Sequence, residues 1–358
     1  MNWGELITLE YGKPVKDKES TDGKVPVYGT NGQIGTSHLP AQCKHPSFIL
    51  GRKGAYRGVH YSDCPFSVID TAFYAEPLTD RIDLKWAYYK FLTYDINGMD
   101  SGSAIPSTDR YQIYSIEVEV PPLEKQRKIV AVLDCIDRKI NINQKVNDNL
   151  EQQAAALFSS LYNRSNTEVR YTDLIQILGG GTPKTGETAY WNGNIAFFTP
   201  KDVGTPYTFI TEKTITEEGL SHCNSRLYPV NTVFVTARGT VGKVGLSGIP
   251  MAMNQSCYAL VGKETHQLLV YFYTLKAVDR LKHKASGAVF DAITTRDFDS
   301  EQIMKLSDDD AKAFLCVAEP MFQEMLNNSI ENLRLSTLRD FLLPKLMSGE
   351  IDVSSVQL

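Results

Sequence analysis

One stretch of this 358-residue sequence, residues 121–161, constrains the fold more than any other. It contains no glycine, and its only prolines are the opening pair Pro121 and Pro122, which a helix tolerates at its start but not deeper. Apolar residues and two asparagines then recur at gaps of four and three, the spacing of a coiled-coil seam. The seam positions are Ile129, Leu133, Ile136, Ile140, Asn143, Asn147, Leu150, Ala154, Leu157 and Leu161. A helix of roughly 55–60 Å, which this length implies, needs a partner helix to bury its apolar stripe.

A second helical segment near the end of the sequence supplies that partner. Ser307 is followed by three aspartates, which fits an N-cap with acidic residues in the first turn. Pro320 is expected to kink this helix or to split off its first turns, and Pro344 and Gly349 bracket its end. Its apolar positions include Phe322, Leu326, Ile330, Leu333 and Phe341.

We therefore expect the two helices to pack as an antiparallel coiled coil. Within that seam, Asn143 and Asn147 either fix register and orientation at some cost in stability, or widen the seam locally, or face solvent. If the helices are antiparallel, the segments that they connect are held apart by a rigid spacer.

The segments before each helix are expected to be rich in β-structure, because short β-branched and aromatic runs alternate with glycines. Between residues 1 and 120, strands are predicted at 25–28, 47–50, 66–69, 72–75 and 113–120, with a helix at 83–94 and a loop at 103–109. Between residues 163 and 305, strands are predicted at 196–199, 232–237 and 256–261, with a helix at 267–284 and a loop at 292–298.

The two halves of the sequence resemble each other locally. Residues 52–59 (RKGAYRGV) parallel 237–244 (ARGTVGKV), residues 102–105 parallel 287–290, and residues 107–111 parallel 294–298, at offsets of about 183 to 187. This internal duplication predicts an α+β fold with a pseudo-two-fold repeat. The expected domains are two β-rich domains at 1–120 and 163–305, helical regions at 121–162 and 306–348, and a tail at 349–358.

Composition restricts the class of protein. No apolar run approaches the roughly 18 residues of a membrane span, and the first residues do not read as a signal peptide. Six cysteines are scattered without a CxxC pair, which fits free thiols in a reducing cytoplasm. The net charge of −5 argues against a strongly basic nucleic-acid binder, but it leaves room for local basic patches.

The chain resembles a known family, the specificity subunit of Type I restriction–modification systems. The resemblance covers nearly the whole chain and rests on the order of its motifs. These are residues 26–35 (PVYGTNGQIG), 121–129 (PPLEKQRKI), 181–183 (GTP), 190–195 (YWNGNI) and 342–351 (LLPKLMSGEI). Both β-rich domains look compact for the family, so loops that reach DNA elsewhere are expected to be shorter here.

The resemblance implies a non-catalytic, cytoplasmic chain. Each β-rich domain would be a target-recognition domain that reads one half of a bipartite site on double-stranded DNA, while the helices set the spacing. Two modification subunits would dock near the helical regions and methylate adenine N6, and restriction subunits could join them. The cofactor S-adenosylmethionine would be bound by the modification subunits, so none is expected in this chain.

Candidate DNA-binding residues lie in loops that combine glycine with Arg, Lys or amide side chains, because these groups reach base edges and phosphates. For any of them the alternative is a structural turn or a solvated charge. The candidates are Thr30, Asn31, Gln33, Arg52, Lys53, Tyr56, Arg57, Thr182, Lys184, Arg238, Thr240 and Lys243, with Lys282 and Lys284 from a basic cluster at 276–284.

Other functions find less support in the residues. The sequence lacks an Asn/Asp-Pro-Pro-aromatic methyltransferase motif, and residues 179–185 (GGGTPKT) have Pro183 where a phosphate loop needs glycine. Cys43, His45, His60 and Cys64 are zinc-type ligands, but their spacing is unusual, so no metal is expected. Two alternatives stay open: a protein-interaction scaffold that does not bind DNA, and the recognition subunit of a different restriction–modification type.

Overall fold

The computed structural model describes residues 1–99, 106–204, 206–284 and 292–356. The chain forms two compact units: unit 1 comprises Met1–Ile140 with Leu333–Leu358, and unit 2 comprises Asn141–Asn332. The repeat between residues 102–105 and 287–290 lies outside the described residues. Among the described helices, none combines the length and the apolar character needed to cross a membrane.

Unit 1 contains two small sheets and a helix that packs on the larger one. The larger sheet has the antiparallel order β1 (Ile7–Tyr11), β7 (Ala72–Pro77), β4 (Ser47–Gly51), β5 (Val59–Ser62). The smaller has the order β3 (Gly32–Ser37), β2 (Val25–Gly29), β6 (Ser67–Val68). Helix α1 (Leu84–Phe91), capped by the Asp83 carboxylate, packs on β4 and buries Trp86 and Phe91 against Trp3. Unit 1 also contains the short helices η1 (Trp3–Glu5), η2 (Ile96–Gly98) and α2 (Arg110–Ser115).

Unit 2 repeats this plan with additions. Its larger sheet has the order β11 (Tyr207–Thr208), β14 (Val244–Ser247), β13 (Val233–Thr236), β16 (Cys257–Gly262), β9 (Ile175–Gly179). Its smaller sheet has the order β12 (Lys213–Ile215), β10 (Trp191–Phe198), β15 (Met251–Met253), and β8 (Thr167–Arg170) pairs with β17 (Gln302–Lys305). Its shorter helices are α4 (Tyr171–Leu174), η3 (Thr188–Tyr190), α5 (Glu217–Ser221), α6 (Gln267–Lys284) and α7 (Thr295–Asp299).

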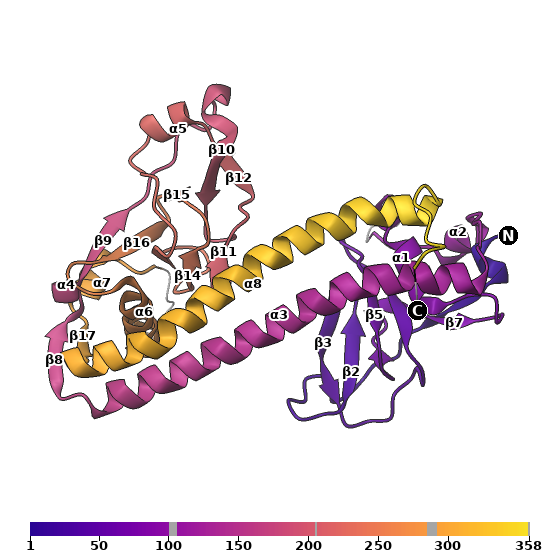
Figure 1. The fold of residues 1–358 in the computed structure, drawn as a ribbon, viewed down its shortest axis with the longest axis horizontal. Coiled ribbons are helices and arrows are strands. Elements are labelled where there is room, and N and C mark those ends of the chain that lie inside the picture. The colour runs from indigo at the N-terminus through magenta and orange to yellow at the C-terminus, as the bar shows by residue number, and fades with distance from the viewer. Residues whose placement is uncertain (100–105, 205, 285–291, 357–358) are drawn as a thin grey trace. The chain divides into compact units, whose positions relative to one another are not determined.

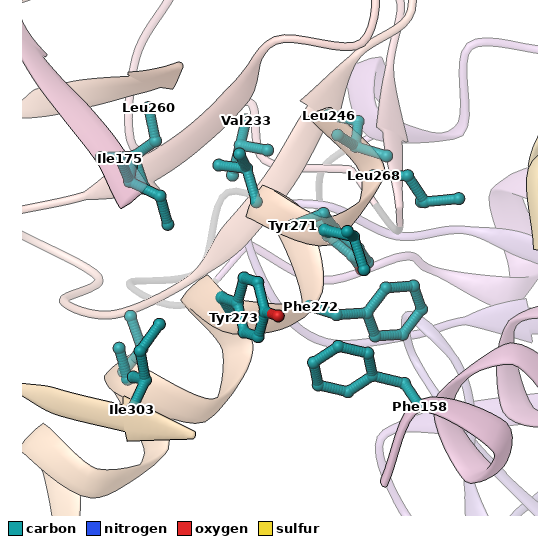
Figure 2. Packing of buried hydrophobic residues seen from close by; sticks show 14 of the residues in the cluster. Phe158, Ile175, Val233, Leu246, Leu260, Leu268, Tyr271, Phe272, Tyr273 and Ile303 are labelled. Carbon is teal, nitrogen blue, oxygen red and sulfur yellow. The ribbon is translucent and has the colours of Figure 1, made fainter. Parts of the chain in front are cut away.

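The core of unit 2 forms where α6 meets the sheet and the long helices. Ten consecutive or near-consecutive positions of α6 are buried, which makes it an internal helix rather than an amphipathic surface one. Figure 2 shows Phe272 of α6 beside Phe158, and their rings stack with centroids 5.0 Å apart. Leu246 and Leu260 of the sheet belong to the same cluster.

Isolated β-bridges show the duplication at the level of the main chain. The bridge between Lys53 and Ser107 recurs between Arg238 and Ala292, with both partners 185 positions later (53 to 238, 107 to 292). The bridge between Cys43 and Phe66 recurs in the same way as Tyr228 with Met251. Sequence therefore predicted the repeat, and the strand orders of the two units confirm it.

Two long helices, α3 (Leu123–Arg164) and α8 (Asp308–Ser348), contribute to both units and run antiparallel within each (Figure 1). In unit 1, Arg339 of α8 donates to Asp137 of α3 at 3.0 Å. In unit 2, Asn143 donates to Asn332 at 2.9 Å, and Asn328 donates to Asn147 at 2.9 Å. The two asparagines of the α3 seam thus bond across to α8 and do not face solvent.

Burial follows the seam that the spacing predicts, with differences in degree. Fully or nearly buried seam residues are Ile129, Leu133, Ile136, Asn143, Ala154, Leu161, Phe322 and Leu326. Half-buried ones are Ile140, Asn147, Leu150, Leu157, Ile330 and Leu333. Phe158 is more deeply buried than Leu157, and Phe341 is 60% exposed, so its assignment to the apolar face was wrong.

Of the two outcomes expected at Pro320, the split does not occur, because α8 continues as a helix from Asp308 through Ser348. Pro320 is exposed, and the buried neighbours Ala318 and Phe322 hold the helix together despite the lost main-chain hydrogen bond.

Residues 110–115 form helix α2 rather than a strand, since the Asp109 carboxylate caps it, and only Glu117 bridges to Asn2. Residues 295–299 form helix α7 rather than a loop, because Thr294 and Asp297 make a capping box.

Candidate nucleic-acid interface

In unit 1, the loop after β4 is fastened to three neighbouring turns. The Arg52 N–H donates to the Thr71 carbonyl at 2.8 Å, and the Thr108 N–H donates to the Arg52 carbonyl at 2.8 Å. At the other end of the loop, the Gly58 N–H donates to the Thr30 carbonyl at 3.1 Å. We call this surface platform 1, defined as residues 30–31, 52–58, 69–71 and 106–111.

Unit 2 builds the equivalent surface with two of these main-chain bonds. The Ala237 N–H donates to the Ser256 carbonyl at 2.8 Å, and the Ile293 N–H donates to the Ala237 carbonyl at 2.9 Å. These match the bonds of Arg52 with a shift of 185 (52 to 237, 71 to 256, 108 to 293). We call this surface platform 2, defined as residues 199–202, 237–243, 254–256 and 292–295.

Two arginines share one tyrosine ring at the edge of platform 1. The guanidinium carbons of Arg52 and Arg110 lie 4.8 Å and 4.9 Å from the ring centroid of Tyr11. Arg110 also lies 5.2 Å from the ring of Tyr111, and its hydrogen bond to the Tyr111 hydroxyl raises the Arg110 pKa. Stacked guanidinium groups keep their planar donors pre-oriented, which suits guanine edges and phosphates.

Sequence reasoning missed three members of this arginine–tyrosine stack. Tyr11, Arg110 and Tyr111 were not candidates, although Tyr11 and Tyr111 are 43% and 66% exposed. Residues 107–111 were recognised as part of the repeat, and the adjacent Arg110 and Tyr111 there were the available signal. Contact with Tyr11 could not be read from spacing, because it joins segments far apart in the sequence.

Two candidates in unit 1 are structural. Arg57 is only 2% exposed, and its Nη2 donates to the carbonyls of Ile96 at 3.3 Å and Asn97 at 2.6 Å. Thr30 is 9% exposed, and its hydroxyl donates to the carbonyls of Lys53 and Thr71. Both side chains are used to hold platform 1 together, and their assignment as DNA contacts stays a prediction.

The other candidates of unit 1 lie on the surface. Asn31, Lys53 and Tyr56 are exposed on platform 1, and Tyr56 is 64% exposed. Lys53 Nζ is 4.0 Å from Asp70, a distance that leaves the ammonium largely hydrated. Gln33 is exposed on β3, where its side-chain amide donates to the Gly35 carbonyl at 3.2 Å.

In unit 2, Arg238, Thr240 and Lys243 are exposed on the turn between β13 and β14. Gly239 and Gly242 adopt positive φ values of 81° and 74°, which this tight turn requires. The Thr240 hydroxyl donates to the Pro200 carbonyl at 3.0 Å, so Thr240 holds the turn against the loop after β10. Arg238 and Lys243 are the two cationic groups that the turn presents.

The loop after β9 extends platform 2. The Thr182 hydroxyl donates to the side-chain oxygen of Gln255, which is exposed on platform 2. Lys184 is exposed, and its carbonyl accepts a hydrogen bond from the Trp191 indole at 3.1 Å. Thr182 therefore orients a platform residue, while Lys184 points its charge to solvent.

The basic end of α6 divides into structural and exposed charges. Lys284 pairs with the Glu301 carboxylate, which is completely buried, and Arg280 donates to the Gln302 carbonyl at 2.6 Å. Lys284 therefore neutralises a buried acid, although its own side chain is 58% exposed, and its assignment as a phosphate contact stays a prediction. Lys282 is exposed and lies against Gly242, which brings its ammonium to the turn of platform 2.

Comparison with known proteins adds a family to this geometry. The family model "Type I restriction modification DNA specificity domain" matches twice, at residues 2–152 and 163–305. These two matches coincide with the two halves of the structural repeat.

Individual relatives carry the same description. The HindI specificity subunit of Haemophilus influenzae is 23% identical over 74% of this chain and 74% of its own length. The MjaIX specificity subunit of Methanocaldococcus jannaschii is 32% identical, but that match covers only 33% of this chain and 29% of the relative. The solved S subunit from M. genitalium, at 16% identity, matches the fold with a TM-score of 0.61 over 97% of this chain and 95% of its own.

Proposed function

The chain belongs to the family of Type I restriction–modification DNA specificity domains, and we propose on that premise that each of its two platforms reads one half of a split DNA sequence. As a specificity subunit it performs no catalytic step of its own. Platform 1 would read one half-site and platform 2 the other.

The repeated platform is the observation that supports this assignment most. Both units hold the loop after the central strand with the same main-chain bonds, yet equivalent positions present different side chains. Lys53 corresponds to Arg238, and Gly58 corresponds to Lys243. A fixed frame with variable side chains is suited to reading two unrelated short sequences, because base edges are distinguished by donor and acceptor pattern.

The long helices would set the number of unread base pairs between the half-sites. Helix α3 has 42 residues and α8 has 41, and both contribute to unit 1 and unit 2. An α-helix rises about 1.5 Å per residue, so helix length converts directly into distance along the duplex. The asparagine bonds of Asn143 and Asn147 to α8 would keep that length constant by fixing the register.

Modification subunits would dock on the helices and methylate adenine at N6 with S-adenosylmethionine that they bind themselves. We propose that two such subunits bind, one for each half of the repeat, and that restriction subunits can join the complex. Ile142 and Val146 support a docking surface, since they lie outside the seam of α3 and are 56% and 39% exposed. The six cysteines are all free thiols, which is consistent with a protein that acts in the reducing cytoplasm.

Methylome sequencing tests the proposal. The chain is expressed with its modification subunit in a host that lacks adenine methylation, and N6-methyladenine is mapped across the genome. The expected result is one split motif that is methylated only when this chain is present. The matched control omits the chain and keeps the modification subunit.

A soluble, intact complex that leaves the genome unmethylated would contradict the proposal. Salt dependence of binding then distinguishes a DNA reader from a scaffold for proteins, because affinity that rests on phosphate contacts falls steeply as salt rises. Methylation of a continuous rather than a split motif would favour the recognition subunit of a different restriction–modification type.

A further inference from the structure

Three ligand-type side chains of unit 1 converge at one place outside platform 1. Cys43 and His45 precede β4, and Glu76 lies on β7. The Cys43 Sγ is 3.9 Å from the His45 Nε2 and 3.8 Å from a carboxylate oxygen of Glu76. The His45 Nε2 is 2.7 Å from the other carboxylate oxygen, and the three ligand atoms lie within 4.8 Å of one another.

These separations suit a small divalent cation. Zinc binds cysteine sulfur at about 2.3 Å and histidine nitrogen or carboxylate oxygen at about 2.0–2.2 Å. Ligand atoms on a tetrahedral ion of that size stand between about 3 and 4 Å apart. The Cys43 distances already lie in that range, and only Glu76 has to rotate slightly away from His45.

The histidine ring is oriented as a metal ligand requires. The His45 Nδ1 lies 3.0 Å from the Pro46 carbonyl, which can only accept, so this nitrogen carries a proton and donates it. The Nε2 faces Cys43 and the Glu76 carboxylate, and it donates a hydrogen bond to that carboxylate at 2.7 Å. A bound ion would take the place of this Nε2 proton. A backbone carbonyl that holds the second ring nitrogen is the usual support of a metal-bound histidine.

The repeat shows that the fold itself does not need these residues. The positions that correspond to Cys43, His45 and Glu76 in unit 2, again 185 later, are Tyr228, Val230 and Val261. Tyr228 occupies the same bridge that Cys43 makes, so the backbone is preserved with no metal-type ligand set. The three ligands of unit 1 thus require a reason other than the fold.

We propose that Cys43, His45 and Glu76 bind one zinc ion, which clamps the segment before β4 to strand β7. A thiolate, an imidazole and a carboxylate are the ligand types that zinc prefers, and they are less suited to calcium or magnesium. Cys43 is fully buried, whereas the side chains of His45 and Glu76 are 38% and 33% exposed. The ion can therefore enter from solvent, and water can take the fourth position.

His60 and Cys64, which share this part of the sequence, do not complete the ligand set. His60 Nε2 lies 3.2 Å from the Thr30 carbonyl, and Cys64 lies beside the Ser62 hydroxyl. Glu76 lies 31 residues beyond His45 in the sequence, so the spacing of Cys43, His45, His60 and Cys64 did not reveal this third ligand. Zinc binding does not depend on DNA recognition. If the chain binds no zinc, the proposed function is therefore unaffected.

Metal titration of the purified full-length chain tests this site. After chelation and removal of the chelator, Zn²⁺ is added and bound metal is measured by mass spectrometry. Co²⁺ is used in parallel, because a thiolate ligand produces a sulfur-to-cobalt charge-transfer band. The expected result is one ion per chain and a charge-transfer band, both lost in Cys43→Ser and both kept in Cys64→Ser, the matched control for an exposed thiol.

A second variant guards against a misfolded Cys43→Ser protein. Glu76→Gln preserves shape and changes a partly exposed side chain, and it should weaken zinc binding at least about tenfold. Absence of stoichiometric zinc uptake by the wild-type chain would overturn the proposal. So would a cobalt charge-transfer band that persists in Cys43→Ser, or zinc affinity unchanged in a folded Glu76→Gln chain.

Discussion

Lys53 and Arg238 occupy the same position in two copies of one fold: Lys53 bridges to Ser107, and Arg238 makes the equivalent bridge to Ala292. The main chain around them is held by the same hydrogen bonds, so the two units differ here in side chain and not in frame. A point-like ammonium on one platform and a planar guanidinium on the other have different preferences for base edges. We therefore expect that each platform can be altered without affecting the other.

Replacing Arg52 with alanine should weaken recognition of the half-site read by unit 1. The guanidinium is pre-oriented by the Tyr11 ring and by its bond to the Asp70 carbonyl at 3.0 Å, so its loss should cost about 1–3 kcal/mol of binding free energy. Fluorescence anisotropy at one fixed salt concentration measures this on duplexes with the correct or an altered half-site.

The matched control for Arg52→Ala is Lys24→Ala, an exposed cation at the start of the hairpin and away from platform 1. Equal affinity of Arg52→Ala and wild type for every duplex would contradict the prediction. A loss that is uniform across all duplexes would instead reassign Arg52 to a phosphate.

The hydrogen-bonded pair Asn147–Asn328 should stabilise the packing of α3 against α8, and a double-mutant cycle should detect this as a coupling energy. Asn328 is 7% exposed and donates to Asn147 at 2.9 Å, so Asn147→Ala leaves a buried amide without its acceptor. The free energy of unfolding should fall by about 1–3 kcal/mol. When Asn147→Leu and Asn328→Leu are combined, the loss should be smaller than the sum of the two single leucine changes, because both polar groups are removed together.

Urea unfolding of the wild type, the two single leucine variants and the double variant checks this coupling. The control is Gln152→Ala on the exposed face of α3. Additive single and double losses would show that the two amides do not act as a pair.

Acid should remove the contribution of the Arg164–Asp310 ion pair. Arg164 Nη2 lies 2.5 Å from Asp310 Oδ1, and hydrogen bonds from Arg164 and Ser307 lower the pKa of Asp310. A depressed carboxyl pKa in the folded state adds stability above the unfolded pKa of about 3.9 and loses it as pH falls through the folded value. Asp310→Asn should thus be less stable than wild type at pH 7, and the difference should shrink below about pH 4. A difference independent of pH would mean that the charge of Asp310 contributes nothing.

Lengthening both helices by one heptad should lengthen the unread spacer. Seven residues inserted between Asn143 and Asn147 in α3, and seven between Asn328 and Asn332 in α8, preserve the seam and add about 10.5 Å. That distance corresponds to about three base pairs. The methylated motif should keep both half-sites and gain spacer, whereas insertion into α3 alone should abolish methylation because the seam loses its register. An unchanged spacer in the double insertion would show that the helices do not set it.

Local patterns predicted most of the fold. Heptad spacing identified α3 and its seam, and the helix at 267–284 was predicted with the bounds of α6. The split considered at Pro320 does not occur, because a helix that packs on both sides of an exposed proline can continue through it. The strand expected at 113–120 failed because Asp109 caps a helix there instead.

The surfaces were harder to predict, since they depend on contacts between distant segments. The stack of Arg110 on Tyr11 joins α2 to β1, and the approach of Glu76 to Cys43 joins β7 to the segment before β4. Arg57 looked like a DNA contact because glycines surround it, but only its burial reveals that it fastens η2. Residue type predicted candidate loops, and tertiary packing decided which side chains in those loops are exposed.

Exchange of one β-rich domain tests the central claim most directly. Residues 1–120 are replaced by the corresponding domain of a relative, and the methylome is mapped beside that of the wild-type chain. The account predicts a motif in which one half changes while the other half and the spacer stay the same. A motif that is unchanged, or one that changes in both halves at once, would contradict the claim that each platform reads its own half-site.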